Sequence, residues 1–234
     1  MRKLCVNLDR IAGLRQLRDS LEPDPVAAAV ICELNGADSI SVRLQSEQAS
    51  IQPRDIKLLR QIVQTQFILE IPNRQDYITL AQKYQPDLLT IIPAYQEGSV
   101  MQTGLKLNHN LQETITALRE NGVNICLLLD PDPLQIKQAI KLDIQAIEIC
   151  TGNYAFLKDK DEIAKELNNI RKAAEIVVQA KLVCAAGHGL DYRNIMPLVQ
   201  IREINEFRIG YALVARAIFT GLDRAIHDIK AIIE

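Results

Sequence analysis

CAAGHGL, residues 184–190, ends an apolar strand and begins a Gly-His-Gly turn. The strand is predicted over residues 182–185, and a helical pattern starts shortly afterwards at Tyr192. The two glycines leave the backbone uncovered on both sides of His188, so its imidazole can meet a ligand beside backbone N–H groups. The segment therefore predicts one strand–turn–helix unit with a candidate functional residue in its turn.

The same unit recurs along the whole chain. Strands are predicted at residues 4–8, 39–44, 67–71, 88–92, 124–129, 146–150, 182–185 and 206–209. Helices are predicted at residues 24–34, 53–64, 74–83, 111–121, 133–142, 159–179, 192–199 and 211–233. Strict alternation indicates parallel strands joined by helical crossovers. Eight such units without a composition break predict an α/β protein with one domain over residues 1–234, a single (β/α)8 TIM barrel. A doubly wound open sheet is the alternative.

Composition narrows the class of protein. The chain has 234 residues, 48% of them apolar, and a net charge of −2. This balance gives no electrostatic case for binding nucleic acid or a membrane surface, and no apolar run approaches the roughly 20 residues of a membrane helix. Five cysteines without a Cys-x-x-Cys spacing suit a reducing cytoplasm and are predicted to be mostly inert core thiols. No metal-binding motif is present, so no metal site is predicted.

A barrel enzyme assembles its active site from the carboxyl ends of different strands. Nine residues at or just after the predicted strand ends can contribute: Asn7, Asp9, Arg43, Glu70, Asp130, Glu148, Cys150, His188 and Gly210. The alternative interpretation is that strand ends are polar because they meet water. Because such residues recur at the end of nearly every predicted strand, an active site is the favoured interpretation.

Glu70 and His188 are the candidate proton-transfer pair. Glu70 lies between apolar neighbours, where a partly desolvated carboxyl group is a plausible general base or acid. The alternative for Glu70 is an ion pair with a neighbouring arginine inside the barrel mouth. The alternative for His188 is a hydrogen-bonded structural histidine, and His109 and His227 are predicted to lie on helix surfaces.

The last two strands carry glycine-rich ends that suit a phosphate. Gly189 follows one strand, and Gly210 with Tyr211 follows the next and opens a helix. Barrels often bind phosphate after these strands through backbone N–H groups and a helix N-terminus. We expect one anion beside Gly189 and Gly210.

With these residues the chain resembles the pyridoxine 5'-phosphate synthase family of the deoxyxylulose-dependent vitamin B6 pathway, over nearly its whole length. The resemblance is carried by VNLD (6–9), LRQLR (14–18), EPDPV (22–26), NGAD (35–38), RD (54–55), LLRQ (58–61), LE (69–70), IE (147–148), TG (151–152), AGHGL (186–190), IG (209–210) and ARA (215–217).

The resemblance implies a barrel with extra helices, assembled as a homo-octamer. It implies a transferase that condenses 3-amino-2-oxopropyl phosphate with 1-deoxy-D-xylulose 5-phosphate to pyridoxine 5'-phosphate, phosphate and water. It also implies acid–base chemistry with neither a metal nor an organic cofactor.

Residue roles follow from the same resemblance. Glu70 matches a proton acceptor and His188 a proton donor. The aminoketone phosphate is matched by Asn7, Arg18, Gly189 and Gly210, with Tyr211 at a position where the family has histidine. Asp9 matches a contact to the deoxyxylulose phosphate.

The chain departs from the family pattern on the deoxyxylulose side. Arg43 stands where the family has a histidine base, and Arg10 replaces a histidine. The family's deoxyxylulose phosphate ligands are here Gln45, Ser50 and Val100. Because a guanidinium stays protonated, Arg43 cannot be a general base, but with Arg10 it can form a replacement anion site.

Three interpretations stay open. The chain is a divergent but working synthase, an enzyme for a related phosphorylated ketone or amine, or a non-catalytic barrel that binds a phosphorylated metabolite or a partner protein. An enzyme is the favoured interpretation.

Overall fold

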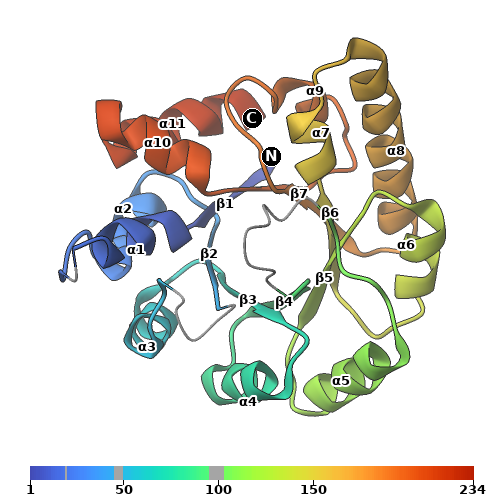
Figure 1. The fold of residues 1–234 in the computed structure, drawn as a ribbon, viewed down its shortest axis with the longest axis horizontal. Helices are drawn as coiled ribbons and strands as arrows, with labels where there is room; N and C mark the ends of the chain where they lie inside the picture. Colours follow the sequence, from blue (N-terminus) through green and yellow to red (C-terminus); the bar gives the residue numbers. More distant parts are fainter. Residues whose placement is uncertain (19, 45–49, 95–102) are drawn as a thin grey trace.

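Eight parallel strands close into a barrel in the computed structural model, which describes residues 1–18, 20–44, 50–94 and 103–234. Each strand pairs with the next along the chain, and the last pairs with the first (Figure 1). The strands are β1 Lys3–Asn7, β2 Ser39–Arg43, β3 Phe67–Pro72, β4 Leu88–Ile92, β5 Ile125–Leu129, β6 Ala146–Cys150, β7 Val183–Gly187 and β8 Glu206–Ile209. The predicted (β/α)8 barrel is confirmed, and closure rules out the open sheet.

Helices surround this barrel (Figure 1). They are α1 Asp9–Gln16, α2 Pro25–Leu34, α3 Pro53–Ile62, α4 Gln75–Tyr84, α5 His109–Glu120, α6 Pro133–Ala139, α7 Gly152–Phe156, α8 Lys160–Gln179, α9 Met196–Val199, α10 Tyr211–Thr220 and α11 Leu222–Ile233. Among the described helices, none is long and apolar enough to cross a membrane.

Two helical predictions were wrong in detail, and two helices were not predicted. The helix predicted over residues 211–233 is two helices, because Gly221 takes a positive φ of 86° that ends α10. The helix predicted over residues 192–199 is reduced to α9, because the Asp191 carboxylate accepts the N–H groups of Arg193 and Asn194 in a turn. Helices α1 and α7 were not predicted, since each is too short to show a clear helical period.

The barrel interior contains an apolar layer, with polar side chains nearer the mouth. The apolar layer is made by Cys5, Ile68, Leu88, Cys126 and Ala146. Two residues further along their strands lie Glu70, Thr90 and Glu148, which alternation places on the same inner face. The side chains of these polar residues are buried, so each must find its partners within the barrel.

The five cysteines are all buried. Burial raises the pKa of Cys126 to about 12 and that of Cys150 to about 12, which keeps both as neutral thiols near pH 7. The prediction that the cysteines lie in the core is confirmed, including for Cys150 at its strand end.

Candidate active site

Arg43 lies at the centre of the barrel mouth, between the two candidate acid–base residues. It is the last residue of β2 and stands opposite Glu70 of β3 in the strand register. Its Nε and Nη2 atoms each lie 2.8 Å from Glu70 Oε2. Its Nη2 atom also lies 2.9 Å from His188 Nε2. One guanidinium therefore joins Glu70 and His188, which are 118 positions apart in the sequence.

This contact decides between the two expectations for Glu70. The sequence left open a free carboxyl group or an ion pair with an arginine in the mouth. The structure contains the ion pair, with the Glu70 side chain 5% exposed and that of Arg43 19% exposed. Burial opposes the charge of Arg43, but Glu70 and Asp9 raise its pKa above the ordinary value. Arg43 is therefore a permanent cation at the mouth.

His188 is held in an unusual backbone conformation. Its φ is +81°, in the left-handed region that residues other than glycine seldom adopt. Thr151 Oγ1 lies 2.7 Å from the backbone oxygens of both Gly187 and His188 and can donate to either one. Such strain typically costs about 1–3 kcal/mol and occurs where the surrounding structure enforces it. The Gly-His-Gly turn thus aims the imidazole at Arg43.

The positions before and after His188 require glycine for different reasons. A Cβ atom on Gly187 would lie 2.3 Å from Glu148 Oε1, so a side chain there would displace the carboxylate. Gly189 has φ +74°, and a Cβ atom would lie 2.6 Å from that of Ala155. The turn therefore packs tightly against both β6 and α7.

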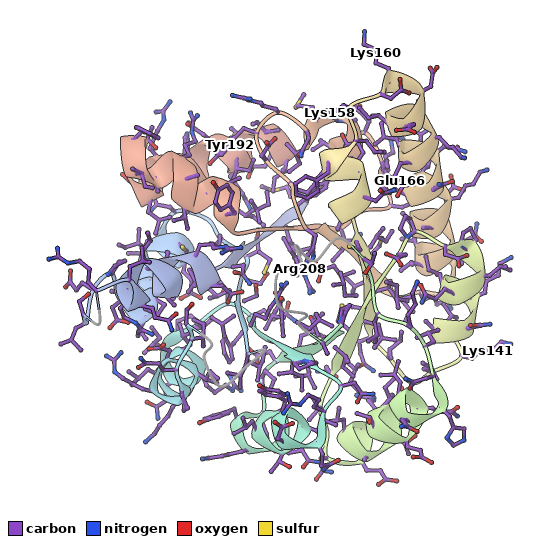
Figure 2. The ribbon with its side chains drawn as sticks, in the orientation of Figure 1. Lys141, Lys158, Lys160, Glu166, Tyr192 and Arg208 are labelled. Atoms are coloured by element: carbon purple, nitrogen blue, oxygen red, sulfur yellow. The ribbon has the colours of Figure 1, made fainter. Side chains whose placement is uncertain are left out.

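Below His188 lies a buried ionic network that we call the inner network: Thr90, Glu148, Glu206 and Arg208. Arg208 Nη1 donates to Glu148 Oε2 at 2.8 Å and to Thr90 at 2.9 Å, and its Nε donates to Glu206 at 2.8 Å. Figure 2 places Arg208 inside the barrel. Burial acts to raise the pKa of Glu148, but Arg208 and then His188 lower it to about 2.

Most of this network lies outside the sequence-based predictions, which name only Glu148 of its four residues. Alternation along β8 carried the signal, because Glu206 and Arg208 are two residues apart and share the inner face of a barrel strand. Opposite charges at that spacing on a buried strand indicate an internal ion pair.

Asn7 and Asp9 connect the end of β1 to the same cluster. Asn7 Nδ2 donates to Glu70 Oε1 at 3.3 Å, and Asn7 Oδ1 accepts the N–H of Asp9 at 3.0 Å. Asp9 Oδ1 accepts the backbone N–H of Arg43 at 2.7 Å. Burial raises the pKa of Asp9 to about 7, with Arg43 acting against it and Glu70 in the same direction. We call Asn7, Asp9, Arg43, Glu70 and His188 the mouth cluster.

Other predicted residues lie at the edge of the mouth. Gly210 directly precedes α10 and lies against Asn7, and Tyr211 is the first residue of that helix with 72% exposure. The Arg10 guanidinium lies 6.0 Å from the centre of the Tyr211 ring. Arg10 is thus exposed on α1, whereas the Arg43 side chain is inside the mouth and 19% exposed.

Two further site predictions lie apart from the mouth cluster, and two cannot be placed. Arg18 is exposed in the turn after α1, without a described side-chain contact to the cluster. The backbone oxygen of Ser50 accepts from Arg15 near α3. Gln45 and Val100 lie outside the described residues.

Asp130 belongs to a different surface. Its carboxylate accepts the N–H of Gly104 at 2.5 Å and lies 3.4 Å from Lys106 Nζ. Asp130 and Lys106 line a cavity of about 300 Å³ between the end of β5 and α6. In the described part of the chain, no group of three or more His, Cys, Asp or Glu side chains is arranged to hold a metal ion.

A closed parallel barrel with glutamate, histidine and arginine in contact at its carboxyl end defines the class of protein, a (β/α)8-barrel enzyme. Comparison with known families identifies the particular one. The family model described as pyridoxal phosphate biosynthesis protein PdxJ matches residues 4–234, and the chain belongs to this family.

Relatives named pyridoxine 5'-phosphate synthase agree with this assignment. The chain is 39% identical to the protein of Synechococcus sp. (strain JA-2-3B'a(2-13)), covering 98% of each chain. It is 38% identical to the protein of Geotalea uraniireducens (strain Rf4), covering 100% of this chain and 99% of the relative. The family expected from the sequence is confirmed.

Solved structures support the fold alone. A tryptophan synthase structure from M. tuberculosis aligns with a TM-score of 0.66 at 13% identity, covering 100% of this chain and 92% of that one. Phosphoribosyl anthranilate isomerase from Thermus thermophilus aligns with a TM-score of 0.63 at 9% identity, covering 98% and 96%.

Proposed function

We propose that this chain catalyses the pyridoxine 5'-phosphate synthase reaction. It condenses 3-amino-2-oxopropyl phosphate with 1-deoxy-D-xylulose 5-phosphate, releasing pyridoxine 5'-phosphate, inorganic phosphate and water. The observation that carries the proposal is the meeting of Glu70 and His188 at one guanidinium in the mouth of a barrel of this family. Two acid–base groups, one from β3 and one from the turn after β7, thereby lie on either side of the Arg43 guanidinium.

The proposed chemistry needs proton transfers rather than a bound redox group. The amine of one substrate and the carbonyl of the other form an imine, and phosphate elimination and ring closure follow. Glu70 accepts protons and His188 donates them in these steps. General acid–base catalysis of this kind typically contributes about 10² to 10⁴ in rate.

Binding of two phosphorylated substrates needs two anion sites. We assign the aminoketone phosphate to the backbone beside Gly189 and to Gly210 at the N-terminus of α10, with Asn7 and Tyr211 next to Gly210 and with Arg18 as a further contact from the turn after α1. A helix N-terminus with free N–H groups favours an anion. We assign the second phosphate to Arg43 and Arg10, with Asp9 contacting the rest of that substrate.

One observation favours a second candidate function, turnover of a related phosphorylated ketone or amine. Arg43 occupies the position that the family pattern gives to a histidine base, and it is paired with Glu70. A cation there binds an anion well but cannot accept a proton. A substrate with a different second half would suit such a site.

We propose phosphorylated small molecules as its ligands, a homo-oligomer as its assembly, the cytoplasm as its location, and residues 1–234 as a single domain.

Growth of a vitamin B6 auxotroph tests the proposed function in cells. A strain lacking its own pyridoxine 5'-phosphate synthase is transformed with this chain or with Glu70→Gln or His188→Asn. We expect growth without added pyridoxine from the wild-type chain alone. Growth that is equal with His188→Asn would contradict the assigned role, and wild-type expression without growth would favour the second candidate.

A further inference from the structure

Arg43 contacts both candidate acid–base residues with the same nitrogen. Nη2 lies 2.8 Å from Glu70 Oε2 and 2.9 Å from His188 Nε2. The backbone N–H of Arg43 is fixed by Asp9 Oδ1 at 2.7 Å. The guanidinium is therefore held from both ends of the residue, and it fills the space that separates Glu70 from His188.

The chemistry of the contact fixes the form of the imidazole. A guanidinium has only N–H donors, so the nitrogen that it contacts must offer a lone pair. His188 Nε2 is therefore unprotonated, and the ring proton is on Nδ1. Nδ1 points to the opposite side, where Glu148 Oε1 lies 3.6 Å away. That distance is too long for a hydrogen bond, and Nδ1 is buried without a hydrogen-bond partner among the described residues.

A histidine in this form cannot donate a proton from the atom that faces the mouth. Glu70 is likewise engaged, because its Oε2 atom accepts from the guanidinium and its Oε1 atom accepts from Asn7. Both groups need Arg43 to move before they can exchange protons with a substrate. The resting arrangement is thus an inactive one.

We propose that Arg43 is a positioning residue that keeps His188 in the Nδ1–H form and releases His188 and Glu70 together when an oxyanion draws the guanidinium away. We call this contact of Arg43 with Glu70 and His188 the arginine latch. It rests on the proposed function only for the identity of the oxyanion, which is a phosphate group of the substrate. Arginine binds phosphate through paired, charge-assisted N–H bonds, which makes phosphate an effective competitor for Glu70.

The charges around His188 support a movement of Arg43 rather than of the imidazole. Glu148 of β6 faces Nδ1 and is fixed by Arg208 of β8 at 2.8 Å. Glu70 of β3 faces the other ring nitrogen through Arg43. The strained backbone of His188 is held by Thr151. The Arg43 side chain is 19% exposed, more than the 12% of His188 and the 5% of Glu70, so a ligand that enters the mouth can reach its guanidinium.

Imidazole ¹⁵N chemical shifts test this latch directly. The chain has three histidines, so His188→Asn assigns the signals of His188 by their loss, leaving those of His109 and His227. In the free wild-type protein we expect a protonated Nδ1 and an unprotonated Nε2 for His188. Saturating inorganic phosphate should move the Nε2 signal of His188 as its contact to Arg43 is lost.

Variants of Arg43 and of a control arginine distinguish a specific role of Arg43 from a general effect on the fold. Arg43→Met should abolish the single-tautomer signature and the response to phosphate. If Arg43→Met fails to fold, Arg43→Lys serves, since one ammonium can pair with Glu70 but cannot span to His188. Arg224→Met, which removes an exposed arginine paired with Asp228 on α11, should leave both observations unchanged.

Three results would overturn the latch: a protonated Nε2 in the free protein, no response of His188 to phosphate, or a wild-type signature in Arg43→Met and Arg43→Lys. None of these measurements requires turnover. Loss of product formation with an intact His188 response would therefore count against the proposed reaction alone.

Discussion

Among single residues of the site, Asp9 has a carboxyl group on which burial, Arg43 and Glu70 all act. The carboxylate of Asp9 accepts the backbone N–H of Arg43, and Glu70 lies on the far side of the same arginine. Two carboxylates thus share one nearby cation in a partly buried place. Burial is the largest influence on Asp9 and raises its pKa to about 7. Asp9 is therefore a proton-exchanging group as well as a structural contact.

The substitution Asp9→Asn should remove one contribution to the pH dependence of the free energy of unfolding. Folded Asp9 keeps its proton to about pH 7, whereas its ordinary pKa is 3.8, so the unfolded chain binds fewer protons between these values. The contribution of Asp9 to the free energy of unfolding therefore falls as the pH rises through this range. Relative to Asp9→Asn, we expect wild type to lose about 2 kcal/mol between about pH 5 and about pH 8.

Urea unfolding at several pH values measures this difference. Asp76→Asn is the matched control, since Asp76 is an exposed carboxylate paired with Arg74. Parallel pH curves for wild type and Asp9→Asn would show that Asp9 is ionised at neutral pH in the folded protein.

At the scale of elements, a buried ion pair joins α1 to the start of α3. Arg15 donates to both carboxylate oxygens of Asp55, at 2.9 and 2.6 Å, and also to the backbone oxygen of Ser50. Asp55 accepts the N–H of Gln52, which caps α3. Burial acts to raise the pKa of Asp55, but Arg15 and this N–H lower it below the ordinary value. The pair therefore holds α1 against the start of α3.

Asp55→Asn should destabilise the protein strongly. It leaves the Arg15 guanidinium buried without a charged partner, and breaking a buried pair from one side costs about 3–5 kcal/mol. Chemical denaturation measures the loss. Asp143→Asn, which breaks the exposed pair with Arg119, should change stability by at most about 0.5 kcal/mol. Similar losses in the two variants would contradict the structural role of the Arg15–Asp55 pair.

The elements differ in how well the sequence predicts them. The strands are short apolar runs, and the predicted ranges at 88–92, 146–150 and 206–209 match the observed strands. Helix α1 was not predicted because it is short and only Ile11, Ala12 and Arg15 of its eight residues are buried, which leaves no clear helical period in the sequence. The division between α10 and α11 depends on the backbone angle of Gly221, which no hydrophobic pattern reveals.

At the scale of the whole molecule, closure of the barrel assembles the site. Parallel strands bring their carboxyl ends to one side, which is why strand-end residues such as Glu70, Arg43 and His188 could be predicted to meet. Which atoms touch could not be predicted, since the Arg43 contact depends on the register of β2 against β3 and on the strained turn after β7. The inner network was missed for a similar reason, because it joins β4, β6 and β8 across the barrel.

Product analysis with purified protein tests the central claim, that this barrel makes pyridoxine 5'-phosphate with Glu70 and His188. The protein is mixed with 3-amino-2-oxopropyl phosphate and 1-deoxy-D-xylulose 5-phosphate, and the products are followed by mass spectrometry. We expect pyridoxine 5'-phosphate from wild type, with the rate reduced by about 10² or more in Glu70→Gln and in His188→Asn. Folded wild-type protein that consumes neither substrate and releases no pyridoxine 5'-phosphate would contradict the claim.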